Sequence, residues 1–449
     1  MNIGESSTKK IPVLKTSLVY AAFGTGSVFM ALSQGSGELI WWPYIVGKYG
    51  LAFVFLLLPA CLLQYPVTYG ICRYTALTGE SIFRGFHRFN KQATFVLWIL
   101  FTLSFLWFGA YATAGATALV ELLPNPFSDI KTNVYFWAVV TVIIYFSFLF
   151  IGRDVYTKIE KVMMFISVFT LLALLVSLYQ NQVRSQIIPV LKASFIPHSI
   201  PSTWDKEDSL RLLTAIMFAG LGGFWNLFNS YWIMAKRTKV ASVDSDEFSF
   251  DKGIIPERDS QVESRWNKFL HLHVSIGTFG NYLTTLFMCI LAFAFLTPKG
   301  EVPYGWKLAV VQSAFFGSAS WLFLIIAALF LIDTWLTTLD AVAKVQVDML
   351  QLYFPKTKTI KPKTIYYLMA VIILFVTLVT MFLSQPGSLL LINGYISAIS
   401  MPVLIAFVFL ANYFVLRDSY FGKQRVIKLL LAVTLIVYTG LFIGYIILS

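Results

Sequence analysis

Long apolar stretches are the feature that most constrains this chain. A helix needs about 20 apolar residues to cross the roughly 30 Å hydrocarbon core of a bilayer, and the sequence contains eleven stretches of this kind. Of its 449 residues, 58% are hydrophobic and 12% are charged, which excludes a soluble fold with a polar surface. We therefore expect an all-α, multi-pass membrane protein with eleven transmembrane helices. The stretches cover residues 18–47, 50–72, 93–122, 133–151, 162–179, 209–235, 269–297, 309–341, 364–384, 388–416 and 426–448.

The basic residues are divided unequally between the two sides of this topology. If the N-terminus is cytoplasmic, the loops on that side hold 25 of the 34 Lys and Arg residues, and the opposite loops hold 8. Because loops rich in Lys and Arg stay in the cytoplasm, the sequence predicts a cell-membrane protein with its N-terminus inside and its C-terminus outside. The net charge of +12 then indicates a positive cytoplasmic face and no nucleic-acid partner.

Two of the apolar stretches are interrupted by glycines. The first contains QGSG, residues 34–37, followed by Glu38, and the sixth contains AGLGG, residues 219–223. Glycine disfavours a continuous helix by about 1 kcal/mol, and paired interruptions at corresponding positions are typical of inverted-repeat secondary transporters. Five spans separate them, so the two repeats would have opposite topology. The alternative is that these glycines serve close packing of helices.

The domain organisation follows from the spans. We expect two inverted repeats of five helices, an outer loop whose prolines predict short helical pieces, a solvated cytoplasmic loop, and an eleventh helix outside the repeat. The corresponding residues are 1–17 for the cytoplasmic N-terminus, 18–179 for the first repeat, 180–208 for the extracellular loop, 209–416 for the second repeat, 237–265 for its cytoplasmic loop, and 417–449 for a linker and helix 11.

Polar residues at the two interruptions are the candidate substrate-binding groups. An unpaired carboxylate inside an apolar span is costly, so Glu38 should be paired, protonated or in contact with substrate. Carboxylate and amide oxygens suit hard cations, so Glu38 and Asn226 are the candidate metal ligands. The full predicted site consists of Gln34, Gly35, Ser36, Glu38, Gly223, Trp225, Asn226 and Asn229.

The eighth span carries two aspartates on one helical face. Asp333 and Asp340 are separated by seven residues, which places them on the same side of a helix. Both are candidates for ion coupling or relay. Asp340 also has a structural interpretation, an ion pair with Lys344 one turn later. His271 and His273 lie near the cytoplasmic start of span seven, where we expect a surface position.

Several stretches resemble the NRAMP family of divalent-metal transporters, which has the LeuT-type fold. They are GTGSVFMALSQGSGE, AGLGGFWNLFNSYWIMAKR and ALFLIDTWLTTLDAVAKVQVDML, which are similar to the family's helices 1, 6 and 8. The resemblance implies a 5+5 inverted repeat plus one helix, with helices 1 and 6 broken at mid-membrane. The family's Asp-Pro-Gly-Asn motif aligns with residues 35–38 and its Met-Pro-His motif with residues 223–225, and neither motif is kept here.

The expected function is a secondary transporter that works by alternating access. Without the family's Asp and Met ligands, the expected cargo is a hard divalent cation such as Mg²⁺. Span three contains no acid before residue 121, so proton coupling should be weak or absent. Two alternatives stay open: a carrier of small, amino-acid-like organic solutes, because GSGE also resembles the break of amino-acid transporters, and a non-transporting receptor or scaffold. No motif predicts an enzyme or a cofactor; the expected partners are the bilayer and the solute or cation.

Overall fold

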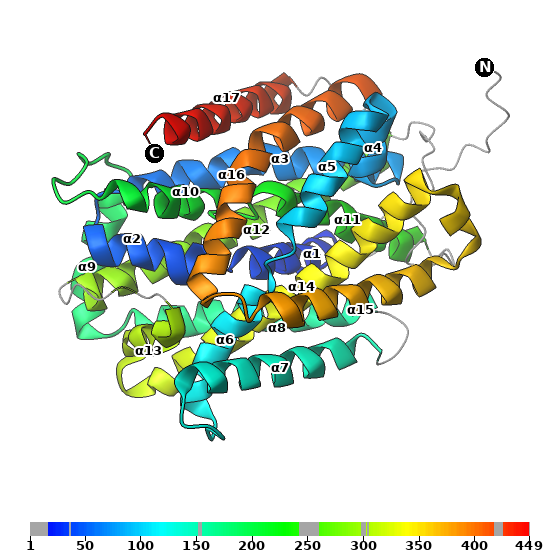
Figure 1. Ribbon diagram of the computed structural model, residues 1–449. Helices are drawn as coiled ribbons and strands as arrows, with labels where there is room; N and C mark the ends of the chain where they lie inside the picture. The colour runs from blue at the N-terminus through cyan, green and yellow to red at the C-terminus, as the bar shows by residue number, and fades with distance from the viewer. Residues whose placement is uncertain are drawn as a thin grey trace, which may run out of the picture.

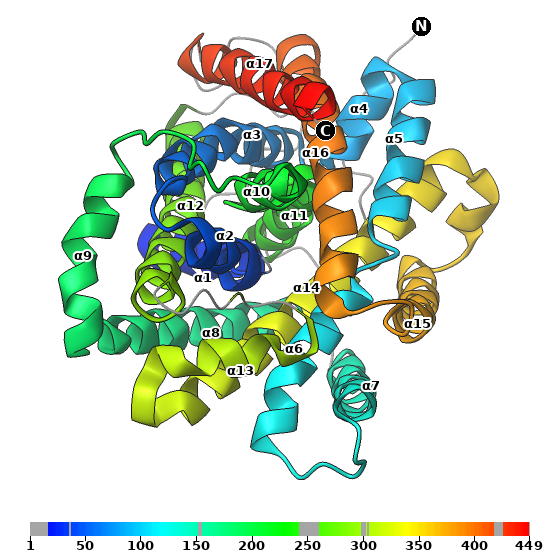
Figure 2. The same ribbon diagram turned by 60° about the vertical axis from the view of Figure 1, so that its left-hand side comes forward.

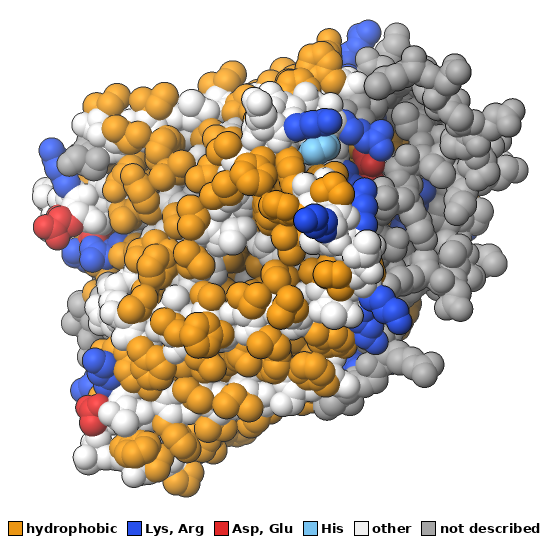
Figure 3. Space-filling view, turned by 45° about the vertical axis from the view of Figure 1, so that its right-hand side comes forward, with side chains coloured by type: hydrophobic (Ala, Val, Ile, Leu, Met, Phe, Trp, Pro, Cys, Tyr) orange, Lys and Arg blue, Asp and Glu red, His pale blue; other side chains and the backbone are white. Residues whose placement is uncertain are grey.

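The computed structural model describes residues 17–35, 37–150, 155–241, 260–297, 302, 305–416 and 425–448. These residues form helices and short connections, with no strand among them. Most of the long helices run side by side in one bundle (Figure 1). Apolar side chains form a broad band across the outside of this bundle (Figure 3), as expected for a surface in contact with lipid.

Nine segments of the described chain are long and apolar enough to cross a membrane. One of these segments is interrupted by a short non-helical turn, so its two parts are labelled as separate helices, α5 and α6. The nine are α3 (Leu57–Thr78), α5 with α6 (Lys91–Ser104 and Gly109–Leu122), α7 (Ile130–Phe148), α8 (Val155–Ser177), α12 (Ser260–Phe295), α14 (Ser320–Tyr353), α15 (Pro362–Thr380), α16 (Pro386–Leu410) and α17 (Arg425–Leu448).

Two further spans are too short to count as single helices because each is broken. The first consists of α1 (Leu18–Ser33) and α2 (Trp42–Tyr49), and the second of α10 (Ser209–Met217) and α11 (Phe228–Ala241). The nine segments and these two broken spans are compatible with the eleven expected helices. The breaks coincide with the two glycine-rich interruptions of the sequence.

The two broken helices lie inside the bundle. α1 packs against α12, α8 and α14, and α10 packs against α16. Figure 2 shows α1 among these helices, whereas α7, α9 (Asn181–Ala193) and α17 lie at the periphery. α17 contacts α3 and α16 from outside, as expected for a helix that does not belong to the repeat.

The short elements lie at the two ends of the bundle. α9 and η3 (Lys206–Asp208) lie within residues 180–208, which the sequence predicts to be an extracellular loop. They are the short helical pieces expected there, and Pro189 lies inside α9. α4 (Ile82–Phe89) lies at the other end, together with η8 (Pro355–Thr359) in the turn between α14 and α15 (Figure 1). The expected cytoplasmic loop 237–265 lies mostly outside the described residues.

The boundaries of span eight were predicted wrongly. The sequence places it at residues 309–341, but α13 (Leu308–Ser313) and η7 (Ala314–Ala319) form a separate segment that ends near Gly317, which has φ 56°. α14 then continues past residue 341 to Tyr353. The reason is that Lys344 and Asp348, which look like loop residues in the sequence, are buried and paired with other side chains.

Candidate cation-binding site

The first broken helix approaches the second at Gly37. α1 ends at Ser33, and the chain continues through a π-helical turn, η1 (Gly37–Trp41), into α2. A Cβ atom added at Gly37 would lie 2.7 Å from the Cβ atom of Phe218, at the end of α10. Glycine therefore permits the two broken helices to meet. Ser36 lies outside the described residues.

The second break is closed by a side chain from α3. Gly222 and Gly223 have φ values of 65° and 42°, a region that favours glycine. Gln64 accepts a hydrogen bond from the N–H of Gly222 at 2.9 Å and donates one to the carbonyl oxygen of Met217 at 2.9 Å. The backbone groups freed by this break are thus bonded to protein. Gln64 was not among the predicted residues, although a lone glutamine in an apolar span is a recognisable signal.

Glu38 is fully buried and faces α12. Its Oε1 atom accepts a hydrogen bond from the hydroxyl of Thr285 at 3.4 Å, and its Oε2 atom has no partner among the described residues. Asn281, one turn earlier on α12, lies within reach of the carboxylate but makes no hydrogen bond of good geometry. The carboxylate is thus approached by the Thr285 hydroxyl and by the backbone of Gly35 and Glu38, and its Oε2 atom has no hydrogen-bond partner in the described part of the chain.

Gln34 contributes a second free oxygen on the same side of the break. Its Nε2 atom donates to the hydroxyl of Thr284 at 2.5 Å, while its Oε1 atom has no partner in the described part of the chain. The amide oxygen of Asn281 is likewise buried without a partner there. Buried polar atoms normally have hydrogen-bond partners, so the oxygens of Glu38, Gln34 and Asn281 that lack one in the described chain make this position a candidate binding site.

A small cavity adjoins these residues. It is lined by Glu38 and Thr284, by Thr170 of α8, and by five apolar side chains: Leu39, Leu174, Met288, Phe323 and Ile326. Its volume of about 10 Å³ is room for about one water molecule. No group of three or more His, Cys, Asp or Glu side chains that could hold a metal occurs in the described ranges. The oxygen donors at this position are carboxylate, amide and hydroxyl groups, and Met288 adds a thioether sulfur to the lining.

The predicted residues Asn226 and Asn229 make other contacts. Asn226 accepts a hydrogen bond from Thr68 of α3 at 2.8 Å, and Asn229 lies 3.2 Å from the Nε2 atom of His273. The amide groups of both asparagines also donate to backbone oxygens of the second break. His273 is buried, so its expected surface position is wrong. It forms part of the polar contacts that hold α11 against α12.

Trp225 belongs to a group of aromatic rings around the first break. Its ring centroid lies 5.1 Å from that of Phe105, 5.6 Å from that of Tyr111 and 5.7 Å from that of Phe228. A Cβ atom at Gly35 would lie 3.4 Å from the ring of Tyr111. The side of the first break that faces α6 is therefore aromatic, whereas the side that faces α12 is polar.

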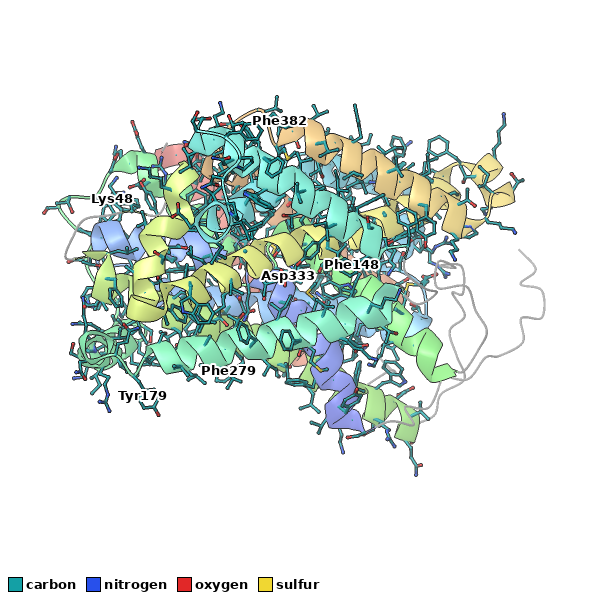
Figure 4. The ribbon with its side chains drawn as sticks, turned by 90° about the horizontal axis from the view of Figure 1, so that it is seen from below. Lys48, Phe148, Tyr179, Phe279, Asp333 and Phe382 are labelled. Carbon is teal, nitrogen blue, oxygen red and sulfur yellow. The ribbon has the colours of Figure 1, made fainter. Side chains whose placement is uncertain are left out.

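The two aspartates of α14 have different surroundings. Asp340 forms an ion pair with Lys344 at 2.9 Å and accepts a hydrogen bond from Tyr366 at 2.7 Å. Asp333 is buried near the middle of the bundle (Figure 4), and its Oδ2 atom has no partner among the described residues. The next residue, Thr334, lies 3.9 Å from the Cβ position of Gly35. Asp333 therefore precedes the residue that approaches the first break, and within the described ranges it has no ion pair.

An ion-pair network joins α2 of the first broken helix to α10 of the second. Asp208 of η3 lies 2.6 Å from Lys48 of α2, accepts hydrogen bonds from Tyr44 and Tyr49, and pairs with Arg211 of α10. Burial alone would raise the pKa of Asp208, but hydrogen bonds from Lys48, Tyr49 and Arg211 outweigh it and hold the pKa below its usual value. Figure 4 shows Lys48 at one end of the bundle.

A second network closes the opposite end. Asp348 of α14 forms an ion pair with Arg84 of α4 at 2.7 Å, and it accepts hydrogen bonds from Ser81 and from Tyr231 of α11 at 3.1 Å. This carboxylate therefore ties α11, the second half of the second broken helix, to α14 and α4. The candidate site lies between two such networks.

Comparison with known proteins supports the architecture. No family model and no curated protein matches this sequence. Among solved structures, a manganese transporter from Eremococcus coleocola, in complex with an aromatic bis-isothiourea compound, has a TM-score of 0.67 at 16% identity; the match covers 98% of this chain and 90% of that one. MhsT in complex with L-phenylalanine has a TM-score of 0.57 at 16% identity, with 97% and 99% covered. The chain thus has the LeuT-type fold that the sequence predicted.

Proposed function

We propose that this protein is a secondary transporter that works by alternating access and binds a cation at Glu38. The fold supplies two broken helices that meet inside an inverted repeat, an arrangement suited to a central site. The Asp208 and Asp348 networks join different elements at the two ends of the bundle, as gates on either side of a site would. The observation that carries the proposal is the set of free buried oxygens on Glu38, Gln34 and Asn281.

The chemistry of these donors favours a hard cation such as Mg²⁺. Carboxylate and amide oxygens suit Mg²⁺ and Ca²⁺, whereas thioether and thiolate ligands select softer metals. A single carboxylate supplies one negative charge, and Mg²⁺ keeps several of its water molecules in most protein sites. Because the cavity beside Glu38 has room for about one water molecule, binding of a partly hydrated Mg²⁺ would require the site to widen during the transport cycle. Manganese should then have little advantage over magnesium at this site.

We also propose weak or absent proton coupling. The membrane part of α5 and α6 carries no acid before Glu121, which lies in the last turn of α6. Asp340 is held by Lys344 and Tyr366, so Asp333 and Glu38 are the acids left for a proton route near the break. A route with so few acidic groups gives no continuous relay.

Liposomes that contain the purified protein test cargo and coupling together. A divalent-sensitive dye should report Mg²⁺ uptake at a rate similar to that of Mn²⁺, and a pH dye should report little acidification. Robust Mn²⁺ uptake with matching acidification would contradict the selectivity and coupling. Absence of flux of any divalent ion, together with no shift of the melting temperature by Mg²⁺, would contradict a cation as the cargo.

A small aromatic solute is the second candidate cargo. The aromatic rings of Trp225, Phe105 and Tyr111 next to Gly35 favour it, because such rings suit an apolar or aromatic ligand. Ligand binding raises the melting temperature in proportion to RT ln(1 + [L]/Kd). Stabilisation by L-phenylalanine but not by Mg²⁺ would favour this candidate, and no response to any solute would favour a receptor or scaffold.

The orientation in the cell membrane is part of the proposal. The division of Lys and Arg between the loops, 25 against 8, supports a cytoplasmic N-terminus and an external C-terminus. Single cysteines placed at residues 197 and 245 test this with an impermeant thiol reagent. In right-side-out vesicles we expect labelling at 197 only; labelling at 245 only would reverse the topology.

A further inference from the structure

Five lysines gather on one end of the bundle although they are far apart in the sequence. They are Lys91, at the start of α5, and Lys356, Lys358, Lys361 and Lys363, in and after η8. All five side chains are exposed, and we call them the lysine surface. α4, the start of α5 and the turn between α14 and α15 lie at the same end of the bundle (Figure 1).

Tyr353 holds the two parts of the lysine surface together. Its hydroxyl donates a hydrogen bond to the carbonyl oxygen of Lys91 at 2.6 Å, and its ring packs edge-on against His87 with centroids 5.0 Å apart. The ring also stacks on Trp98, with a centroid distance of 6.1 Å and an interplanar angle of 4°. Because Tyr353 is the last residue of α14, these contacts place η8 beside the start of α5.

Within the described residues, no acid is paired with this surface. Residues 81–104 and 349–371 contain no Asp or Glu. The nearby acids Glu80 and Asp348 are engaged by Arg88 and Arg84, respectively. In the described part of the chain, no ion pair involves any of the five lysines. Figure 3 shows Lys and Arg side chains at both edges of the apolar band, with more of them at the edge beside the grey residues.

The lysines lie at the depth of lipid headgroups. On α5 the first strongly exposed apolar residue is Val96, five residues after Lys91; on α15 it is Leu368, five residues after Lys363. Five helical residues span about 7.5 Å, so both lysines lie just outside the apolar band. Exposed Phe89 and Phe354 lie among them, as aromatic residues do at membrane interfaces.

From this geometry we propose that the lysine surface binds anionic phospholipid headgroups of the adjoining leaflet. Clusters of four to eight basic residues next to a transmembrane helix attract anionic lipids. Here the cations form a single surface from two segments, and the exposed aromatic and aliphatic residues beside them would contact the acyl chains of the same lipid. The phosphate group is the chemistry recognised, and the lipid is its source.

Native mass spectrometry of the full-length protein in detergent tests this. Phosphatidylglycerol should bind at least about tenfold more tightly than phosphatidylcholine. A variant with Lys356→Gln, Lys358→Gln and Lys361→Gln should lose that preference to within about threefold, and Arg at the same positions should restore it. A control with Lys192→Gln, Lys206→Gln and Lys307→Gln, at the opposite end of the bundle, should behave as wild type.

Three results would overturn the proposal. The first is equal binding of the two lipids by the wild type, and the second is full phosphatidylglycerol preference in the Gln variant. The third is displacement of the lipid by an equal concentration of inorganic phosphate, which would show that the ligand is a free anion. Unchanged melting temperatures and elution volumes of all variants would show that the comparison concerns binding and not folding.

Discussion

The two broken helices of this fold differ in what they leave unbonded. At the second break, Gln64 bonds the freed backbone groups on both sides, and Asn226 and Asn229 are bonded to Thr68 and His273. At the first break, Glu38, Gln34 and Asn281 each keep an oxygen without a partner in the described chain. The two breaks therefore differ in function. At the second break the polar groups named above are bonded to protein, whereas at the first break polar oxygens are left that could bind a ligand.

The contrast between the two breaks also concerns which helices supply the polar groups of the candidate site. The resemblance to NRAMP transporters implies ligands from both broken helices, and the predicted site accordingly combined Glu38 with Asn226. In the structure the polar groups nearest Glu38 come from α12, and the second broken helix offers Trp225 and other rings instead. We infer that the cation site is formed between the first break and α12.

The largest effect should come from Glu38→Gln. The amide keeps the size of the side chain but removes the only carboxylate of the site, so we expect cation affinity to fall at least about a hundredfold, or roughly 2.7 kcal/mol. Removal of a buried carboxylate with a free oxygen should leave the melting temperature unchanged or higher. Flux in liposomes and thermal unfolding measure the two effects. Wild-type flux in this variant would show that Glu38 is structural.

The paired variants Gln64→Leu and Gln34→Leu test the contrast between the breaks directly. Loss of Gln64 leaves the N–H of Gly222 and the carbonyl of Met217 unsatisfied, at a cost of about 1–3 kcal/mol each. We therefore expect a clear drop in melting temperature and unchanged cation affinity. Gln34→Leu should show the reverse, because it removes a free oxygen and one hydrogen bond. If both variants have a lower melting temperature and unchanged cation affinity, then Gln34, like Gln64, has a structural role and does not bind the cation.

Asn281 and Asn226 should show the same contrast between cation affinity and stability, with smaller effects. Asn281→Ala removes a free amide oxygen, and we expect affinity to fall about tenfold, or 1.4 kcal/mol, with little change in stability. Asn226→Ala removes the hydrogen bond from Thr68, which contributes about 1 kcal/mol, and should leave affinity unchanged. Isothermal titration and thermal unfolding of both proteins measure this. An equal loss of cation affinity in both variants would show that Asn226 also contributes to cation binding.

Most of the architecture could be predicted because it follows from local rules. Apolar length predicted the spans, and glycine clusters predicted both breaks. The ion pair of Asp340 with Lys344 follows from their spacing on one helix. The end of span eight was misplaced because Asp348 looks like a loop residue until its partners are known. Those partners, Arg84 and Tyr231, lie on α4 and α11.

The partners of Glu38 could not be predicted for the same physical reason. Asn281, Thr284 and Thr285 are ordinary polar residues in a long helix, and the sequence does not say which neighbour α12 presents them to. Only the packing of α1 against α12 brings them to the break. The signal that could have found them is the grouping of an amide and two hydroxyls within five residues of an otherwise apolar stretch.

The last variant, Asp208→Asn, tests whether α2 of the first broken helix and α10 of the second are held as one unit. Because the pKa of Asp208 is held below its usual value, its stabilising contribution is present above about pH 4 and is lost as the pH falls through the lower pKa of the folded protein. The wild type should therefore unfold at a higher temperature than the variant at pH 7, and the difference should shrink below pH 4. A variant with Glu207→Gln, a neighbouring exposed acid, should lack this dependence. A constant difference between wild type and Asp208→Asn from pH 7 to pH 3 would show that the charge of Asp208 does not hold α2 to α10.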